Sequence, residues 1–254
     1  MSAVVRFDGF TKRYGGQVAV EGLDFEVGAG RVVGLLGPNG AGKSTALRGL
    51  VGLLRPTSGS ATLFGQPFEE LRSPARRVGV HMDGIGFETG ITGRRHLEIC
   101  ALSAGVPRSR VDAVLEEVGL GDAGGKRVGK YSTGMRQRLG LASALIGEPE
   151  LLVLDEPANG LDPEGIRWLR RFVRRFAEAG GTVLLSNHQL AEMAQTVDEV
   201  VVIRRRTLFA GTLDMLTEGG AHDLEERFFE LLDAEHAEHA EREANASGTA
   251  VSRA

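Results

Sequence analysis

A glycine-rich segment, Gly37 to Thr45, constrains the fold of this chain more than any other feature. It reads Gly-Pro-Asn-Gly-Ala-Gly-Lys-Ser-Thr and follows the apolar run from Arg31 to Leu36. A helical pattern from Ala46 to Leu54 comes directly after it, and Pro56 ends that pattern. A strand, a glycine loop and a helix in this order are the context that the G-x-x-x-x-G-K-[ST] motif requires. The segment therefore predicts a nucleotide-binding α/β core.

The chemistry of this loop accounts for its residue types. Glycines allow successive backbone N–H groups to turn toward phosphate oxygens, and the helix N-terminus adds a partial positive charge. Lys43 would neutralise the β- and γ-phosphates of a bound nucleotide, and the Ser44 hydroxyl would bind Mg²⁺. The predicted nucleotide-binding residues of the loop are Gly37, Pro38, Asn39, Gly40, Ala41, Gly42, Lys43, Ser44 and Thr45.

Two carboxylates follow a second apolar strand. The run from Leu151 to Leu154 ends in Asp155 and Glu156, and α/β sheets bind ligands just beyond the carboxyl ends of their parallel strands. We expect Asp155 to complete the Mg²⁺ site, and Glu156 to orient or deprotonate the attacking water. Together with Lys43, Glu156 is therefore a candidate catalytic residue.

The remaining strand patterns place the loop in a larger sheet structure. Two β-rich stretches before the loop, Val4 to Phe10 and Gly22 to Val27, predict an antiparallel β flap. Further strands are expected from Ser60 to Phe64, from Arg77 to Met82 and from Thr182 to Ser186. The expected fold class is thus α/β, a P-loop NTPase core with an antiparallel β flap and an inserted α-helical subdomain.

Changes in pattern and composition suggest the domain boundaries. Helical periodicity from about Arg94 to Gly119 indicates the inserted subdomain, at about 84–149 within a main unit covering 1–220. Residues 221–254 form a separate C-terminal part. Its stretch from Asp223 to Glu243 predicts a helix with an apolar stripe, and residues 244–254 are expected to be disordered.

The composition excludes several classes of protein. A net charge of −4 gives no global electrostatic reason to bind nucleic acid, so the basic run Arg204 to Arg206 is interpreted as a solvated strand end. The one cysteine, Cys100, lies in an apolar stretch, which favours a core position and a reducing compartment. Neither a signal peptide nor a membrane-spanning run is visible, so the chain is expected to need another polypeptide to act across a membrane.

A segment after the helical region connects these motifs to a known family. Tyr131 to Met135 reads Tyr-Ser-Thr-Gly-Met and precedes Arg-Gln-Arg. It resembles the signature loop of ABC transporter ATP-binding subunits, Leu-Ser-Gly-Gly-Gln, and the family's other elements recur in order over nearly residues 1–215. This resemblance implies that Ser132 and the backbone of Gly134 complete the ATP site of a second, opposite cassette.

The resemblance implies further site residues. Tyr14 occupies the place of the aromatic residue that stacks on adenine, although it could be an ordinary strand tyrosine. Asn159-Gly-Leu-Asp162 matches the loop through which two cassettes contact each other, with Asp162 as its acidic residue. His188 matches the histidine that hydrogen-bonds the γ-phosphate, which makes it a third catalytic candidate beside Lys43 and Glu156.

Two positions depart from the general family pattern. Asp83 stands where most members have a glutamine that contacts Mg²⁺ and the transmembrane partner, so Asp83 is a candidate metal ligand beside Ser44 and Asp155, with a simple turn aspartate as the alternative. Thr133 and Met135 replace Gly and Gln of the signature. Both variations resemble the branch of exporters that includes bacitracin, lantibiotic and antitumour-antibiotic resistance cassettes.

The resemblance implies an enzyme that hydrolyses ATP with Mg²⁺ to drive transport, by export in particular. The expected partners are a separate transmembrane permease and a second cassette, as a homodimer at the cytoplasmic face of the cell membrane, with no nucleic acid. One alternative is a soluble ABC ATPase with a non-transport partner, but the coiled-coil insertion or linked second cassette that it would need is not visible. Another alternative, an ATP-binding scaffold that does not hydrolyse ATP, is raised by Asp83 and Thr133 and opposed by Glu156 and His188.

The C-terminal helix carries one pattern that could suggest a metal site. His236 and His239 lie among Glu235, Glu238 and Glu241 at helical spacing. An exposed helix rich in Glu and Ala explains this pattern more simply, so no metal site is predicted there. The apolar stripe of the same helix is expected to pack onto the main unit, with a dimer or partner contact as the alternative.

Overall fold

Five parallel strands and one antiparallel edge strand form the central sheet of the computed structural model, which describes residues 3–82, 84, 86–187 and 189–251. Its strand order is β5-β6-β7-β3-β8-β9. The strands are β3 (Val32–Leu36), β5 (Val78–His81), β6 (Leu151–Leu154), β7 (Thr182–Ser186), β8 (Glu199–Arg204) and β9 (Arg206–Thr212). Because layers cover both faces of this sheet, β3, β6 and β7 are apolar runs rather than alternating ones and are buried along their whole length.

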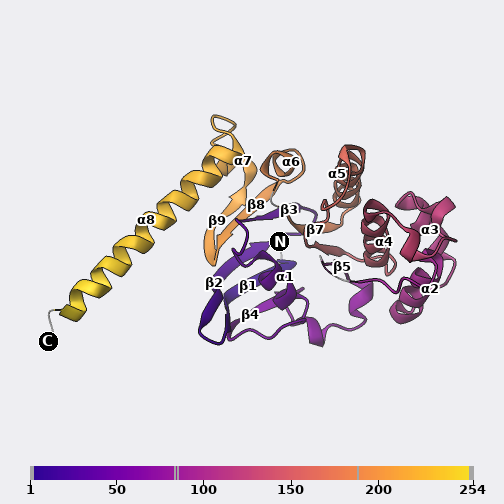
Figure 1. Cartoon of the computed structure of the whole chain (residues 1–254), viewed down its shortest axis with the longest axis horizontal. Coiled ribbons are helices and arrows are strands. Elements are labelled where there is room, and N and C mark those ends of the chain that lie inside the picture. Colours follow the sequence, from indigo (N-terminus) through magenta and orange to yellow (C-terminus); the bar gives the residue numbers. More distant parts are fainter. Residues whose placement is uncertain (1–2, 83, 85, 188, 252–254) are drawn as a thin grey trace.

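A second sheet of three antiparallel strands lies beside the helix that follows the glycine loop (Figure 1). Its order is β2-β1-β4, with β1 (Val5–Tyr14) paired to both β2 (Gln17–Val27) and β4 (Ser58–Leu63). This is the antiparallel flap that the sequence predicts. The strands reach further than predicted, since β1 continues to Tyr14 and β2 begins at Gln17, across the Gly15-Gly16 turn.

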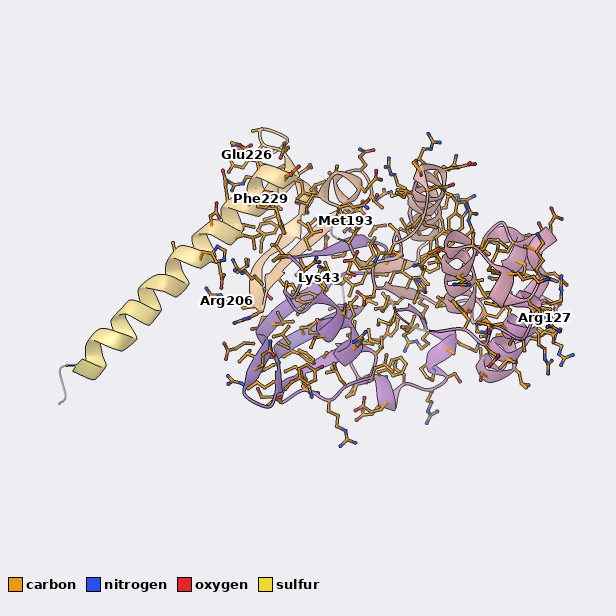
Figure 2. The ribbon with its side chains drawn as sticks, viewed as in Figure 1. Lys43, Arg127, Met193, Arg206, Glu226 and Phe229 are labelled. Atoms are coloured by element: carbon orange, nitrogen blue, oxygen red, sulfur yellow. The ribbon has the colours of Figure 1, made fainter. Side chains whose placement is uncertain are left out.

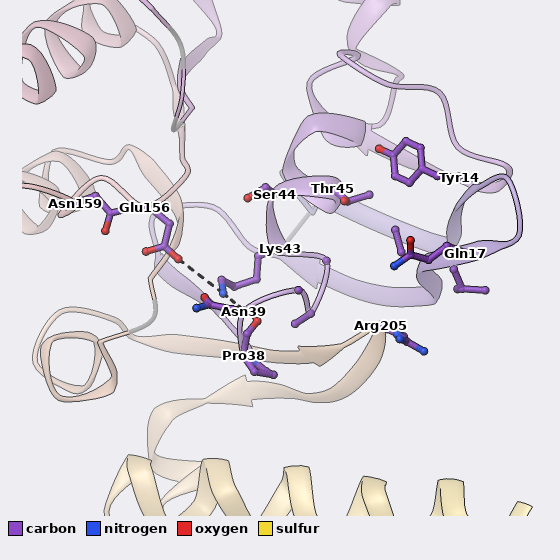
Figure 3. Close-up of a pocket in the computed structure, with 15 residues that line it drawn as sticks. Tyr14, Gln17, Pro38, Asn39, Lys43, Ser44, Thr45, Glu156, Asn159 and Arg205 are labelled. Carbon is purple, nitrogen blue, oxygen red and sulfur yellow. Dashed lines mark hydrogen bonds and ion pairs between the residues drawn. The ribbon is translucent and has the colours of Figure 1, made fainter. Parts of the chain in front are cut away.

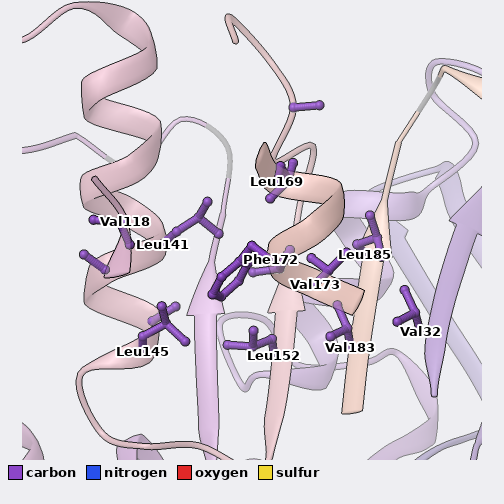
Figure 4. Close-up of a cluster of buried hydrophobic side chains, with 14 of the residues drawn as sticks. Val32, Val118, Leu141, Leu145, Leu152, Leu169, Phe172, Val173, Val183 and Leu185 are labelled. Carbon is purple, nitrogen blue, oxygen red and sulfur yellow. The ribbon is translucent and has the colours of Figure 1, made fainter. Parts of the chain in front are cut away.

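Two apolar clusters hold these layers together, one on each face of the central sheet. The first joins the two sheets around α1 (Lys43–Leu50), with Phe10, Leu35 and Leu47 fully buried. The second lies under α4 (Thr133–Leu145), α5 (Pro163–Glu178) and α6 (Leu190–Ala194). Figure 4 shows Phe172 of α5 beside the side chains of the strands. The glycine loop therefore starts from a strand that is fixed from both sides.

The predicted helical region is divided into two helices. They are α2 (Gly93–Ala104) and α3 (Arg110–Glu117), and both contact α4. The division occurs at Gly105, whose φ of 66° ends α2 in the left-handed region that favours glycine. Cys100 of α2 packs against the second cluster, and burial raises the pKa of its thiol, in agreement with a core position.

Short helices connect the larger elements. They are η1 (Phe68–Glu70), η2 (Pro74–Arg76), η3 (Gly121–Ala123), η4 (Val128–Lys130) and α7 (Leu213–Leu216).

The C-terminal helix α8 (Leu224–Val251) packs at its start and then extends away from the sheets (Figure 1). Leu224, Phe228 and Leu232 are buried against α6, α7 and β9, so the apolar stripe packs onto the main unit. The helix continues eight residues beyond Glu243, where the sequence predicted its end and a disordered tail. Alanines at positions 244, 246 and 250 are strong helix formers and favour this continuation. Among the described residues, no helix is both long and apolar enough to cross a bilayer.

Candidate active site

The glycine loop forms the floor of a pocket of about 560 Å³ between β2 and the carboxyl end of the central sheet (Figure 3). We call it the phosphate-loop pocket. Its lining is Tyr14, Gln17, Val18, Ala19, Pro38, Asn39, Gly40, Ala41, Gly42, Lys43, Ser44, Thr45, Glu156, Asn159 and Arg205. Eight of the nine residues predicted from the loop line this pocket, and Gly37 accepts a hydrogen bond from Lys43 through its carbonyl oxygen.

Two glycines of the loop are required by close packing. A Cβ on Gly37 would lie 2.4 Å from the carbonyl oxygen of Ile203, and a Cβ on Gly42 would lie 2.1 Å from Val20 Cγ1. Gly42 also has a φ of 101° and precedes α1 without a side-chain cap. The first N–H groups of α1 therefore have no side-chain partner at Gly42, and such an end suits an anion.

Lys43 is held inside the loop. Its Nζ donates a hydrogen bond to Gly37 O at 2.7 Å and another to Pro38 O at 3.4 Å, and lies 3.8 Å from Glu156 Oε1. Only 7% of its side chain is exposed. Burial lowers the pKa of Lys43, and the negative charges of Glu156 and Asp155 partly oppose this effect. The loop thus holds a cation at its centre, facing the predicted catalytic carboxylate.

Asp155 lies at the centre of a hydrogen-bond network that joins three elements. Its Oδ1 accepts hydrogen bonds from Ser44 Oγ at 3.1 Å and from Ser186 Oγ at 2.7 Å. Ser186 Oγ in turn accepts a bond from the backbone N–H of Glu156 at 2.9 Å. The ends of β6 and β7 and the start of α1 are thereby fixed to one another.

The second oxygen of Asp155 has a different environment. Asp155 is 1% exposed, and its Oδ2 has no hydrogen-bond partner among the described residues. A buried carboxylate oxygen without a partner is costly, because it has lost its water without replacement. A cation bound at this oxygen and at Ser44 Oγ would remove the cost.

Glu156 adopts an unusual backbone conformation. Its φ of 49° is in the left-handed region, which is uncommon for residues other than glycine. Strain of this kind persists where the surrounding structure enforces it, and it often occurs at functional sites. Here the hydrogen bond that the Glu156 N–H donates to Ser186 Oγ holds the Glu156 backbone, and Glu156 lines the pocket.

Tyr14 lies at the other end of the pocket (Figure 3). The residue is 54% exposed although it belongs to a strand, and Lys12 Nζ lies 5.2 Å from the centre of its ring. An ordinary core tyrosine would be buried. An exposed ring on a pocket wall instead offers a surface on which a flat base could stack.

The predicted signature residues are outside the phosphate-loop pocket of their own chain. Ser132 caps α4 by accepting a bond from Met135 N at 3.2 Å, and neither Ser132 nor Gly134 lines the pocket. Asp162 caps α5 by accepting a bond from Gly165 N at 2.7 Å, and it does not line the pocket either.

One glutamine links the signature helix to two other segments. Gln137 of α4 accepts a bond from His81 Nε2 at 2.6 Å, at the end of β5. Its Nε2 donates a bond to Asn159 O at 2.9 Å, and the Asn159 side chain lines the phosphate-loop pocket. In the sequence, Gln137 stands out only as the middle residue of the Arg-Gln-Arg run after the signature, and no local motif indicates this connection.

Two predicted site residues, His188 and Asp83, lie outside the described residues. Other pocket residues were not predicted, namely Gln17, Val18, Ala19 and Arg205. They reach the pocket through the pairing of distant strands, which local motifs do not reveal. Ser186 could have been recognised as the polar last residue of a buried strand.

We predict that Gly42→Ala weakens nucleotide binding about tenfold or more. The added Cβ would collide with Val20, and alanine at a φ of 101° adds strain. Isothermal titration calorimetry with ATP would measure the effect, and circular dichroism would verify folding. Gly16→Ala is the matched control, because its Cβ would meet no atom within 4 Å. Wild-type affinity in Gly42→Ala would contradict the proposed packing.

Comparison with known proteins agrees with this geometry. The ABC transporter family model matches residues 20–159, from β2 to the loop after Glu156. The bacitracin transport ATP-binding protein BcrA of Bacillus licheniformis is 44% identical over 211 residues, which cover 82% of this chain and 69% of that protein. The daunorubicin/doxorubicin resistance protein DrrA of Streptomyces peucetius is 40% identical, over 82% of this chain and 65% of that protein.

Other relatives extend the comparison to nearly whole chains. The lantibiotic transport ATP-binding protein SrtF of Streptococcus pyogenes is 34% identical over 89% of this chain and 96% of its own. A solved ATP-binding subunit of an ABC transporter superposes with a TM-score of 0.82 at 27% identity, covering 90% of this chain and 99% of that one. The chain therefore belongs to the ABC transporter family, as an ATP-binding subunit of the kind that hydrolyses ATP to power transport.

Proposed function

We propose that this subunit powers the export of an antibiotic or related peptide through a separate permease, by closing two cassettes around Mg-ATP. The observation that carries the proposal is the arrangement at the carboxyl end of the sheet, where Asp155 has a buried oxygen without a partner among the described residues and Glu156 Oε1 lies 3.8 Å from Lys43 Nζ. This arrangement can bind a metal nucleotide and place a carboxylate beside it.

The donor set fits Mg²⁺. Magnesium prefers oxygen ligands and is commonly bound by one or two protein groups together with substrate phosphates. Asp155 Oδ2 and Ser44 Oγ are the oxygens that would hold it, directly or through water. Asp83 remains a proposed third ligand on the strength of the family resemblance alone. When bound, the metal would neutralise charge on the phosphates.

The other loop residues have roles that follow from their positions. Lys43 exchanges its bonds to Gly37 and Pro38 for phosphate oxygens, and the N–H groups at the start of α1 bind the same anion. Glu156 orients the attacking water and accepts its proton, and His188 assists at the γ-phosphate. Tyr14 stacks on the adenine at the exposed end of the pocket.

A second copy of the chain is proposed to complete each site. Ser132 and Gly134 begin α4 outside their own phosphate-loop pocket, so they are available to the γ-phosphate bound by an opposite cassette. Asp162 and the loop from Asn159 lie between the two regions and would form the contact between subunits. A homodimer is the simplest such assembly.

The relatives support the cargo and the location. BcrA, DrrA and SrtF are named for bacitracin transport, daunorubicin/doxorubicin resistance and lantibiotic transport. A permease with such a cargo would place this subunit at the cytoplasmic face of the cell membrane. No helix among the described residues is long and apolar enough to cross a bilayer, and attachment through a permease requires none.

We predict that Glu156→Gln lowers ATP hydrolysis by roughly 10²–10⁴-fold, because the water loses its general base. The variant should form dimers that depend on Mg-ATP, since bound ATP is no longer consumed. Steady-state hydrolysis and sedimentation velocity would measure both effects. Glu164→Gln, in the exposed first turn of α5, is the matched control.

Two results would contradict these roles separately. Hydrolysis at the wild-type rate in Glu156→Gln would exclude Glu156 as the base. A variant that binds ATP and remains a monomer would exclude the homodimeric site, whatever the rate of hydrolysis.

The export proposal predicts a growth phenotype. Replacing the chromosomal gene with the Glu156→Gln form should lower the inhibitory concentration of at least one antibiotic of the bacitracin, lantibiotic or anthracycline classes by fourfold or more, because export loses its power source. The Glu164→Gln form should match the wild type. Unchanged sensitivity to all three classes would contradict this cargo without affecting the assignment as an ATPase.

A further inference from the structure

Arg205 occupies a position that the motifs of the family do not explain. It forms the one-residue turn between β8 and β9, where Arg204 pairs with Arg206. Its side chain lines the phosphate-loop pocket, and it also lines a neighbouring cavity of about 630 Å³. Pro38 to Ala41 form a wall common to both cavities, and α8 contributes Glu235 and His236 to the second one.

The backbone of Arg205 is fixed in a conformation that suits glycine better. Its φ is 60°, in the left-handed region, where a side chain adds strain. Two backbone hydrogen bonds hold it there. Arg205 N donates to Ala41 O at 2.9 Å, and Arg205 O accepts from Glu21 N at 2.6 Å. The turn is thus bonded to the phosphate loop on one side and to β2 on the other.

The side chain of Arg205 lies toward the nucleoside end of the pocket. Figure 3 shows it near Gln17, on the side of the loop opposite to Glu156 and toward Tyr14. Among the described residues, no carboxylate lies within ion-pair distance of it. A guanidinium with five donors in the plane of its fork can serve the oxygen and nitrogen acceptors of a ribose and a purine.

The arginines on either side of the turn are in contrast paired. Glu235 Oε2 lies 3.6 Å from Arg204 Nε, and Glu235 Oε1 lies 3.6 Å from Arg206 Nη2. The Glu235 side chain is only 14% exposed, and Figure 2 shows Arg206 on the side of the hairpin facing α8. One carboxylate of α8 therefore holds both flanks of the turn that carries Arg205.

We propose that Arg205 binds the nucleoside part of ATP, and that Glu235 of α8 is a positioning residue that acts through Arg205. The proposal rests on ATP occupying the phosphate-loop pocket. Arg205 donates hydrogen bonds to the ribose or to the base, which stacks on Tyr14. These bonds offset the strain of the Arg205 backbone. α8 thereby affects the affinity for nucleotide without touching it.

Arg205→Gly tests the contact, because glycine suits a φ of 60° and the turn should keep its shape. We expect ATP and ADP to bind the full chain roughly tenfold more weakly, while inorganic tripolyphosphate binds with wild-type affinity, as measured by calorimetry. Arg13→Gln removes the same charge next to Tyr14 without altering the pocket lining and should leave all three affinities unchanged.

Other patterns would overturn the contact. Equal weakening for ATP and tripolyphosphate would mean that Arg205 acts on the phosphates, and unchanged ATP binding would mean that it touches no part of the nucleotide. If the wild type binds tripolyphosphate but not ATP, the phosphate-loop pocket is not an ATP site. That result would contradict the proposed function and not only the role of Arg205.

A double-mutant cycle tests the positioning role of Glu235. We expect Glu235→Gln to weaken ATP binding severalfold in the wild-type background and to have no further effect in Arg205→Gly. Glu235→Gln should lower the midpoint of thermal unfolding equally in both backgrounds, since the ion pairs of Glu235 with Arg204 and Arg206 are lost in each. An equal loss of ATP affinity in the two backgrounds would overturn the positioning role.

Discussion

The site depends on close backbone packing around the phosphate loop. Gly37 lies against the backbone of Ile203 in β8, and Gly42 lies against Val20 in β2, at distances that exclude any Cβ. The loop therefore joins the central sheet to the antiparallel flap, and neither glycine can move without moving a strand. Because interiors are packed at crystal density, the loop keeps its shape before any anion binds. Preorganised N–H groups lose less entropy on binding than a mobile loop would.

The two carboxylate oxygens of Asp155 have different environments. Oδ1 is bound by Ser44 and Ser186, which fixes the side chain, and Oδ2 is buried without a partner among the described residues. Ser186 also holds the backbone of Glu156 in its strained conformation, because its Oγ accepts a hydrogen bond from the Glu156 N–H. The positions of Asp155, proposed to bind the metal, and of Glu156, proposed as the catalytic base, are thus both set by one hydroxyl group at the end of β7.

The sequence predicts site residues well where they lie together in one continuous segment. The strand, loop and helix around Lys43 and the strand that ends in Asp155-Glu156 follow from the sequence, because each motif lies directly beside the buried strand that positions it. Arg205 was interpreted as part of a solvated strand end. Its contact with the pocket depends on the pairing of β8 with β3 and on the bond to Ala41, both of which join residues more than 150 positions apart.

The pairing of Gln137 with His81 and Asn159 shows how separate motifs are joined within one chain. His81 ends the strand that leads to Asp83, Gln137 follows the signature loop on the same helix, and Asn159 follows Glu156 in the pocket wall. A shift of α4 would therefore be transmitted to the backbone of Asn159 through one side-chain amide with both ends bonded. Since the start of α4 is the part proposed to meet a second cassette, the proposed closure of two cassettes would act on the backbone that follows Glu156 through this amide.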